Sequence, residues 1–328
     1  LMAANGSQEK VDVLIYGPSK PVVDNGFSAN FVLHKFENQR DLGRISPEVA
    51  ARIRGIAVTG LVQADAAMLA KFPKTEIVSS FGVGYDHVDF KYAAGHNIIV
   101  TNTPDVLTEE VADTALGLLI ATLREFIEAD RYLRAGHWST KGFPLSRGSL
   151  RDRRVGMVGM GRIGQAIARR LDASLVPVVY HSRNPAKGVT YKHYPNLIEM
   201  AKDVDTLIAI TPGGPSTAKM INAEVLKALG PRGVFINVAR GSVADEDALI
   251  AALKDGTIMA AGLDVFANEP EVPDALKVMK NVVLLPHIAS ASITTRNAMD
   301  QLVVDNLKLW FEGKAPLTPI AETPVKGR

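Results

Sequence analysis

The sequence predicts an α/β protein with two Rossmann-like parallel-sheet domains, on three observations. The chain has 328 residues, which corresponds to about two domains at roughly 150 residues each. Short β-branched segments alternate with longer amphipathic segments along nearly the whole length, as in βα units around a parallel sheet. Hydrophobic residues make up 47% and charged residues 22% of the chain, values that are typical of globular proteins and not of disordered ones.

The strand candidates fall into two groups, and each group is large enough for a sheet of its own. The N-terminal group consists of Val11–Tyr16, Phe31–Phe36, Ile56–Thr59, Glu76–Ser80 and Ile98–Thr101. The second group consists of Arg154–Val158, Val176–Tyr180, Thr206–Ile210, Val234–Asn237, Met259–Leu263 and Val282–Leu285.

Two long helices are predicted, at Asp105–Ile127 and Ile293–Phe311. Glu109 and Glu110 lie near the start of the first helix, where its dipole favours negative charge. One helix precedes the second group of strands and the other follows it, so we expect the chain to cross between domains twice and the first domain to be discontinuous. The end of the chain, 313–328, is rich in Pro, Lys and Thr and is predicted to be a surface strap or a partly mobile end.

Composition excludes several classes of function. Lys and Arg total 37 against 35 Asp and Glu, a balance that does not favour nucleic acid as a partner. There is no cysteine, which excludes disulfides, zinc–thiolate sites, iron–sulfur ligation and thiol nucleophiles, and no metal site is predicted. The longest apolar stretch, Ala112–Leu123, is shorter than the ~20 residues that span a bilayer. No membrane role is expected. We expect a cytoplasmic location.

A glycine-rich turn follows the strand candidate Arg154–Val158 and opens a helix, with the pattern G-x-G-x-x-G at Gly159, Gly161 and Gly164. In such a turn the first glycine makes the tight bend, the second lets a pyrophosphate approach the backbone, and the third allows close helix–strand packing. The pyrophosphate would bind free N–H groups at the start of the helix, so Arg162 and Ile163 are also assigned to the cofactor site. A purely structural turn is the alternative, but the strand–turn–helix context favours dinucleotide binding.

The end of the next strand candidate indicates which dinucleotide is bound. NAD sites usually carry Asp or Glu about 20 residues after the glycine turn, whereas an arginine there suits a 2′-phosphate. Residues 181–184 read His-Ser-Arg-Asn, with no acid. Ser182, Arg183 and Asn184 are therefore predicted to bind the phosphate, and NADP(H) is favoured over NAD. The alternative is that Arg183 is a solvated loop residue.

Gly82 and Gly84 form a second glycine pair after the strand candidate Glu76–Ser80. Small residues at such a turn expose backbone N–H groups that suit a small anion such as a carboxylate. An ordinary βα turn explains the spacing equally well.

Three charged or titratable residues follow strand candidates of the second group: Arg240, Glu269 and His287. Ligands of open α/β sheets bind at the carboxyl ends of the strands. Ketone reduction by hydride transfer needs a cation to polarise the carbonyl and hold a carboxylate, together with an acid that protonates the oxygen. Arg240 offers a bidentate guanidinium, and a Glu269 carboxylate beside His287 would keep the imidazole protonated. Taken singly, each residue could be structural or solvated.

These motifs, together with Thr101–Pro104 (TNTP) and Leu107–Asp113 (LTEEVAD), resemble the D-isomer-specific 2-hydroxyacid dehydrogenase family over nearly the whole chain. Within the family they look most similar to the NADPH-dependent glyoxylate/hydroxypyruvate and hydroxyphenylpyruvate reductases. The resemblance implies that Arg240, Glu269 and His287 are catalytic and that His287 is the proton donor.

Further site residues follow from the resemblance alone. It implies that Val83 and Gly84 give backbone N–H groups to the substrate carboxylate, and that Thr108 and Asp264 lie on the nicotinamide side. Trp138 matches a tryptophan that can reach a neighbouring subunit's active site in similar enzymes, although a surface-packing tryptophan would look the same in the sequence.

The resemblance also implies a cofactor domain of residues 103–289 inserted into a flavodoxin-like substrate-binding domain of 1–102 and 290–328. A homodimer formed through the cofactor domain is expected. The implied reaction is NADPH-dependent reduction of glyoxylate or hydroxypyruvate to the D-2-hydroxy acid. The alternatives are hydroxyphenylpyruvate or another 2-oxo acid as substrate, or a non-catalytic dinucleotide-sensing module, which the complete Arg/Glu/His set disfavours.

Overall fold

The computed structural model describes residues 10–29, 31–60 and 62–325, and these residues form two compact units. The first unit comprises the described residues up to Leu107 and from Ile293 onward, and the second unit comprises Thr108–Ser292. The chain thus leaves the first unit once and returns to it. The two crossing points lie after residues 107 and 292, where the sequence led us to expect 102 and 289.

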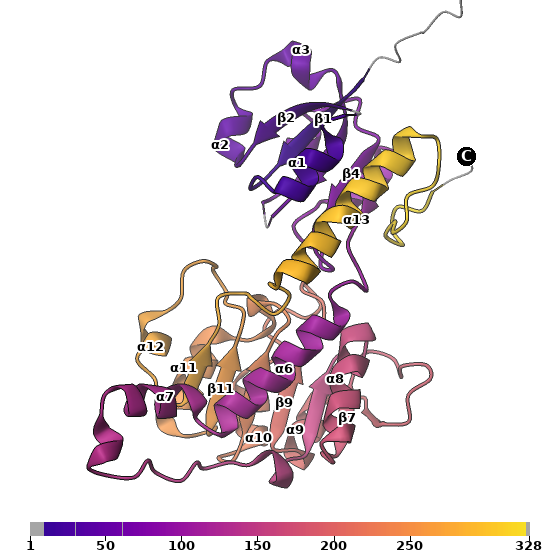
Figure 1. Ribbon diagram of the computed structural model, residues 1–328. Coiled ribbons are helices and arrows are strands. Elements are labelled where there is room, and N and C mark those ends of the chain that lie inside the picture. The colour runs from indigo at the N-terminus through magenta and orange to yellow at the C-terminus, as the bar shows by residue number, and fades with distance from the viewer. Residues whose placement is uncertain (1–9, 30, 61, 326–328) are drawn as a thin grey trace, which may run out of the picture. The chain divides into compact units, whose positions relative to one another are not determined.

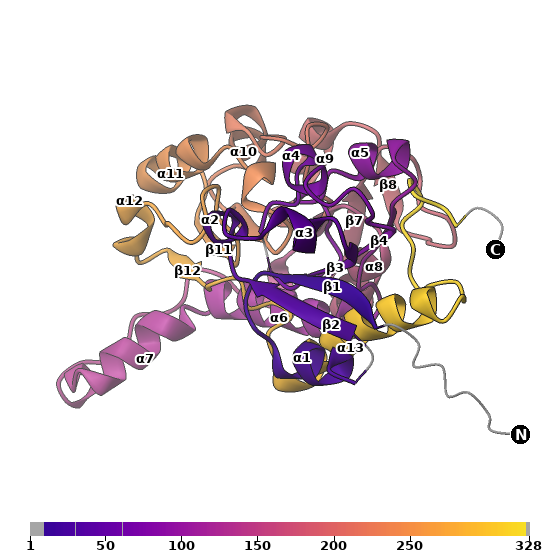
Figure 2. The same cartoon turned by 90° about the horizontal axis from the view of Figure 1, so that it is seen from above.

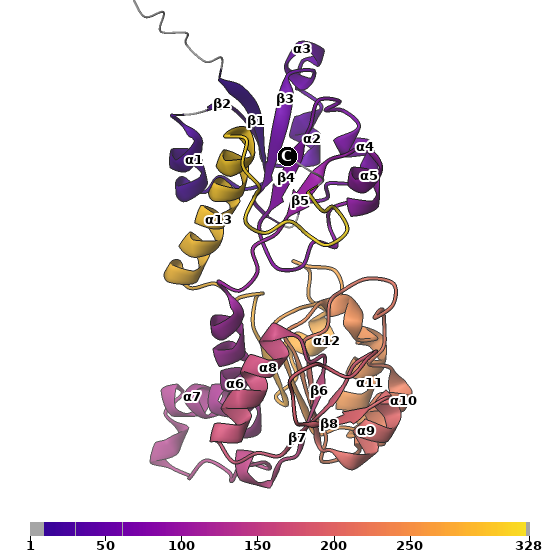
Figure 3. The same ribbon diagram turned by 90° about the vertical axis from the view of Figure 1, so that its right-hand side faces the viewer.

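The first unit contains a five-stranded parallel sheet in the order β2-β1-β3-β4-β5, which is the order of flavodoxin-like folds. Its strands are β1 (Val11–Tyr16), β2 (Phe31–Phe36), β3 (Ile53–Val58), β4 (Ile77–Ser80) and β5 (Ile99–Thr101). Its helices are α1 (Pro21–Phe27), α2 (Gln39–Leu42), α3 (Pro47–Ala50), α4 (Ala66–Leu69), α5 (Phe90–Gly95) and α13 (Ile293–Phe311). Helices α1 and α13 lie on one face of the sheet and α4 and α5 on the other (Figure 3).

The segment after α13 lies along the edge strand β5. Ile320 donates its N–H to the carbonyl oxygen of Val100 at 2.9 Å, and the Thr323 hydroxyl accepts the N–H of Val100, also at 2.9 Å. The segment therefore covers an open edge of the sheet, as a strap would. Residues 326–328, which belong to the predicted strap, are outside the described residues.

The second unit contains a seven-stranded parallel sheet in the order β12-β11-β10-β9-β6-β7-β8, a Rossmann-type order. Its strands are β6 (Val155–Val158), β7 (Val178–His181), β8 (Lys192–Tyr194), β9 (Thr206–Ala209), β10 (Val234–Asn237), β11 (Ala260–Leu263) and β12 (Val282–Leu284). Its helices are α6 (Thr108–Leu123), α7 (Phe126–Arg134), α8 (Arg162–Ala173), α9 (Leu197–Asp203), α10 (Ala223–Leu229), α11 (Glu246–Asp255) and α12 (Asp274–Lys277). Helices α6 and α8 pack together on one face, and α9, α10 and α11 cover the other (Figure 1).

The prediction of one long helix over Asp105–Ile127 is wrong in one respect, because this segment contains two helices. Helix α6 ends at Leu123, and Glu125 adopts a left-handed conformation with φ of 53° before α7 begins at Phe126. Helix α7 projects away from the rest of the second unit (Figure 2). Its side chains Phe126 and Leu133 are 49% and 54% exposed. Helix α7, called the arm below, therefore presents apolar surface.

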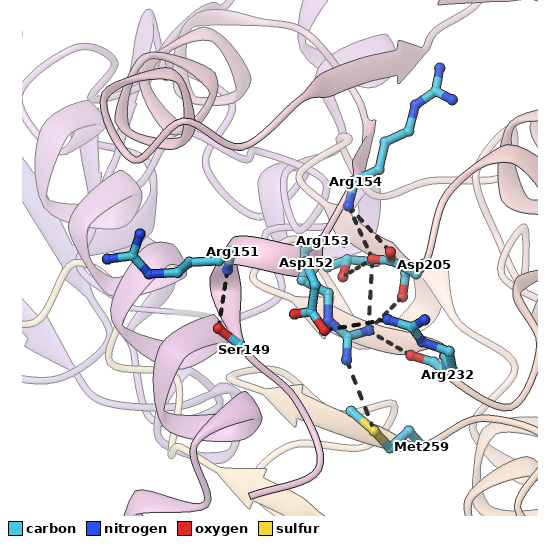
Figure 4. A network of polar contacts seen from close by, with 9 residues as sticks. Ser149, Arg151, Asp152, Arg153, Arg154, Asp205, Arg232 and Met259 are labelled. Atoms are coloured by element: carbon cyan, nitrogen blue, oxygen red, sulfur yellow. Dashed lines mark hydrogen bonds and ion pairs between the residues drawn. The ribbon is translucent and has the colours of Figure 1, made fainter.

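A buried arginine joins several loops at the amino-terminal edge of the second sheet (Figure 4). The Arg153 side chain is 1% exposed and its Nη1 donates to the carbonyl oxygen of Arg232 at 2.6 Å. Asp205 Oδ1 lies 3.7 Å from the same nitrogen, and Met259 Sδ lies 4.0 Å from Nη2. The segments that precede β6, β9, β10 and β11 are thus held by one side chain, at the edge opposite to the carboxyl ends of the strands.

Among residues 10–29, 31–60 and 62–325, no helix has the length and apolar character needed to cross a membrane. The same residues contain no group of three or more His, Cys, Asp or Glu side chains arranged to hold a metal ion.

Candidate active site

His287 and Glu269 lie together on loops at the carboxyl edge of the second sheet. His287 Nδ1 is 2.6 Å from Glu269 Oε2, and Glu269 Oε1 accepts the N–H of Phe266 at 3.0 Å. Burial raises the pKa of Glu269, but the hydrogen bonds from His287 and Phe266 and the positive charges of His287 and Arg240 outweigh burial, so its pKa is lowered. Glu269 is thereby kept as a carboxylate beside the imidazole.

The backbone after β10 brings Arg240 to the same place. The side chain of Asn237 holds the turn: Oδ1 accepts the N–H of Ala239 and Nδ2 donates to the carbonyl oxygen of Arg240, both at 3.1 Å. Gly241 then packs directly on the loop that carries Glu269, because a Cβ added at Gly241 would lie 1.9 Å from the backbone of Phe266. Only glycine permits this approach, which sets Arg240 near Glu269.

Asp264 lies under the His287 loop. It is 1% exposed, and its two carboxylate oxygens accept the N–H groups of Ile288 at 2.7 Å and Ala289 at 2.9 Å. His287 has a left-handed φ of 54°, and its own N–H donates to the carbonyl oxygen of Asp264 at 2.9 Å. Burial raises the pKa of Asp264, and the two backbone N–H groups partly offset this. The carboxylate of Asp264 therefore holds the strained loop.

The glycine-rich turn lies at the carboxyl end of β6. Gly159 has a φ of +107°, and a Cβ added to it would lie 3.0 Å from the carbonyl oxygen of Ile210. A Cβ at Gly164 would lie 2.6 Å from the carbonyl oxygen of Gly159, whereas a Cβ at Gly161 would have no neighbour within 4 Å. The first and third glycines thus serve packing, and the second leaves open space at the start of α8. Arg162 and Ile163 form the first turn of α8, which has no side-chain N-cap.

The loop with Ser182, Arg183 and Asn184 lies next to this turn, because the N–H of Gly159 donates to the carbonyl oxygen of His181 at 2.9 Å. Ser182 Oγ donates to the carbonyl oxygen of Asn184 at 2.6 Å, which closes a tight bend around Arg183. The residues Arg183 and Asn184 are exposed, so the guanidinium can reach a ligand.

Val83 and Gly84 belong to the first unit, in the turn after β4. The N–H of Gly82 donates to Thr103 Oγ1 at 2.8 Å, and Asn102 Nδ2 donates to the carbonyl oxygen of Val83 at 2.9 Å. Among the described residues nothing accepts a hydrogen bond from the N–H groups of Val83 and Gly84. This turn is therefore anchored, with two donors left for an anion.

Two further predicted site residues lie at the start of α6 and after α7. Thr108 is the first residue of α6. Trp138 is 66% exposed and lies in the turn His137–Ser139, which follows α7, and not on a loop at the carboxyl edge of the sheet.

Two residues that support the site, Asn237 and Gly241, were not predicted from the sequence. Asn237 was detectable in principle, because an amide at the end of the apolar strand VFIN must find hydrogen-bond partners when buried. The role of Gly241 depends on a contact between two loops that no local pattern reveals.

The chain is similar to known proteins over most of its length. Residues 116–289 match the family model described as D-isomer specific 2-hydroxyacid dehydrogenase, NAD binding domain. A glyoxylate/hydroxypyruvate reductase A of Arabidopsis thaliana is 42% identical over 312 residues, covering 95% of this chain and 99% of the relative. A hydroxyphenylpyruvate reductase of Plectranthus scutellarioides has the same identity and coverage.

Among solved structures, the chain is similar to an NADPH-dependent glyoxylate/hydroxypyruvate reductase from Sinorhizobium meliloti in complex with NADP and malonate. The TM-score is 0.93 and the identity is 53%, covering 97% of this chain and 99% of the other. The likeness extends over nearly the whole length of both chains. The chain belongs to the D-isomer specific 2-hydroxyacid dehydrogenase family.

Proposed function

We propose that the protein is an NADPH-dependent reductase that converts a small 2-oxo acid, glyoxylate or hydroxypyruvate, into its D-2-hydroxy acid. The observation that carries the proposal is the hydrogen bond of 2.6 Å between His287 and Glu269, placed near Arg240 on the sheet edge that also carries the glycine turn. The relatives named as glyoxylate/hydroxypyruvate reductases support the same substrate class.

The residues of the second unit fit a phosphorylated dinucleotide. The space beside Gly161 and the uncapped first turn of α8 suit the pyrophosphate. Arg183, with Ser182 and Asn184, would hold a 2′-phosphate, and residues 181–184 contain no carboxylate to repel it. When bound, NADPH supplies the hydride to C2 of the substrate.

In the proposed reaction Arg240 binds the substrate carboxylate and polarises its carbonyl through the planar guanidinium. His287 donates a proton from Nε2 to the carbonyl oxygen, because Nδ1 is engaged by Glu269. Glu269 stabilises the protonated imidazole, and Asp264 holds the loop on which His287 lies. The N–H groups of Val83 and Gly84 are proposed to bind the substrate carboxylate, and Thr108 the nicotinamide side.

The decisive experiment follows NADPH absorbance with glyoxylate, hydroxypyruvate, hydroxyphenylpyruvate and 2-ketogluconate. We expect kcat/KM to be highest for glyoxylate or hydroxypyruvate. A higher kcat/KM for hydroxyphenylpyruvate would favour a second candidate function, reduction of hydroxyphenylpyruvate, which the relative from Plectranthus scutellarioides supports. NADPH binding by calorimetry without oxidation by any 2-oxo acid would show a dinucleotide-sensing module instead.

The same experiment tests the cofactor. Repeating it with NADH should give a much lower kcat/KM, and Arg183→Asp should shift preference towards NADH, because a carboxylate there binds the ribose 2′-hydroxyl. Equal efficiency with both coenzymes would contradict the assignment of NADPH.

A homodimer formed through the second unit is also proposed. The exposed apolar side chains Phe126 and Leu133 of α7, and Trp138 of the turn that follows it, support the dimer, because soluble monomers rarely expose clustered apolar side chains. Trp138 would then lie near the partner subunit.

A cytoplasmic location, suggested by composition, remains a prediction.

A further inference from the structure

The loop that carries Arg183 is tethered at its start by a histidine from the edge strand. Nε2 of His193, in β8, lies 2.9 Å from the carbonyl oxygen of Ser182. The His193 ring also packs on Tyr180, with ring centroids 5.1 Å apart. The contact follows from strand register, because Tyr180 of β7 pairs directly with His193 of β8.

A second tether holds the far end of the same bend. The hydroxyl of Tyr180 accepts the N–H of Ala186 at 2.9 Å, and Tyr180 is 2% exposed. The two aromatic side chains therefore fix both ends of the segment 182–186, and the Ser182 hydroxyl closes the bend between them. Arg183 is thus carried on a backbone whose conformation is set from beneath.

Strand β8 has attachments that do not involve His193. The hydroxyl of Tyr194 donates to Asp203 Oδ2 at 2.6 Å, and the carbonyl oxygen of Tyr194 lies 2.8 Å from His181 Nδ1. Loss of the His193 ring should accordingly loosen the loop and leave the strand in place.

We propose that His193 and Tyr180 are positioning residues that determine specificity for a nucleotide with a 2′-phosphate. A loop that is ordered before binding loses less conformational entropy when Arg183 contacts the phosphate. NADH lacks that phosphate, so its affinity should not depend on the tethers. This inference rests on the proposed use of NADPH by the enzyme.

The test compares His193→Leu, His193→Gln and Tyr180→Phe in the full-length enzyme, with KM and kcat measured for NADPH and for NADH. Loss of one hydrogen bond that orders the loop should raise the KM for NADPH about fivefold to tenfold, with kcat and the KM for NADH within about twofold. His193→Gln keeps an N–H donor and should restore most of the NADPH affinity. Tyr180→Phe should act in the same direction as His193→Leu.

His96 provides a matched control in the first unit. Its Nδ1 lies 2.8 Å from the carbonyl oxygen of Tyr92, and its ring stacks on that tyrosine with centroids 3.8 Å apart. His96→Leu removes the same kind of contact away from the coenzyme loop and should leave both KM values unchanged.

Arg183→Ala separates the inference from the proposed function. If Arg183→Ala raises the KM for NADPH and His193→Leu does not, the positioning role is wrong while the NADPH assignment stands. An equal rise in both coenzyme KM values in His193→Leu would show a general structural role and would also overturn the inference. If Arg183→Ala leaves the KM for NADPH unchanged, the positioning role and the NADPH assignment are both contradicted.

Discussion

One carboxylate links the imidazole of His287 to the loop after β11: Glu269 Oε2 lies 2.6 Å from His287 Nδ1, and Glu269 Oε1 accepts the Phe266 N–H at 3.0 Å. The ring orientation is therefore set by the backbone of another loop. Because Nδ1 is engaged, Nε2 is the nitrogen left for proton transfer, and among the described residues it has no hydrogen-bond partner.

Replacing His287 by Ala should lower kcat by about 10² to 10⁴, the usual contribution of a general acid. The Kd for NADPH, measured by fluorescence titration, should stay close to that of the parent, since His287 is assigned to the substrate and not to the nucleotide. Turnover near that of the parent would remove His287 from the mechanism.

Glu269 predicts a pH dependence whose sign follows from its lowered pKa. Burial alone would raise this pKa, but the partners His287, Phe266 and Arg240 bring it below the usual 4.5. The carboxylate therefore stabilises the folded protein above pH 4.5, and this stabilisation is lost as the pH falls through the lowered pKa. In urea unfolding, the difference in the free energy of unfolding between the parent and Glu269→Gln should shrink as the pH falls below 4.5. A difference that grows with acidity would contradict the sign.

Gly241→Ala should abolish most activity although it adds a single methyl group. The new Cβ would meet the backbone of Phe266 at 1.9 Å, so the loops that carry Arg240 and Glu269 must separate. We expect kcat/KM for the 2-oxo acid to fall by at least about 10², as displacement of positioned groups does. Gly95→Ala is the control, because a Cβ there meets nothing within 4 Å. Parent-like kcat/KM in Gly241→Ala would refute this packing.

Arg153→Met should affect stability and not catalysis. The substitution leaves the buried carbonyl oxygen of Arg232 without its donor at 2.6 Å, and we expect the free energy of unfolding to fall by about 2 to 3 kcal/mol. Arg151→Met, at an exposed neighbour, should change it by less than about 0.5 kcal/mol. Chemical denaturation measures both. The values of kcat/KM should not change, because Arg153 lies at the amino edge of the sheet.

The proposed dimer is tested by Phe126→Ser combined with Leu133→Ser, which makes the arm polar. Sedimentation should show a dimer for the parent and a monomer for the double variant, since exposed apolar side chains would supply the contact. Leu175→Ser, at a residue that is 87% exposed outside the arm, is the control. A parent that is monomeric would contradict the proposal.

Most of the fold was predictable because buried parallel strands are continuous apolar runs between turns. Val11–Tyr16, Phe31–Phe36, Val234–Asn237 and the helix Ile293–Phe311 have the predicted bounds. Strand β8 was not predicted, since Lys192–Tyr194 is short and polar and is defined by pairing with β7. The break at Glu125 was also missed, because a left-handed glutamate leaves no mark on apolar periodicity.

The gathering of three charged or titratable residues in the candidate site was predictable from the sequence. Arg240, Glu269 and His287 were chosen because they follow strands, and the structure places them on one edge of one sheet. The supporting contacts were not predictable. Gly241 against Phe266, and Asp264 beneath the His287 loop, depend on how loops far apart in sequence approach each other.

The insertion of the second unit affects how the chain can be made. In the first unit Ser79 Oγ donates to the carbonyl oxygen of Val303, which lies 224 positions later in the chain, and α13 packs on α1, β3 and β4. On a ribosome, the N-terminal strands therefore emerge long before the helix that covers them, while the second unit is contiguous and can fold as it emerges. A released chain that ends at residue 292 should contain a protease-resistant second unit attached to an N-terminal region that is still open to cleavage.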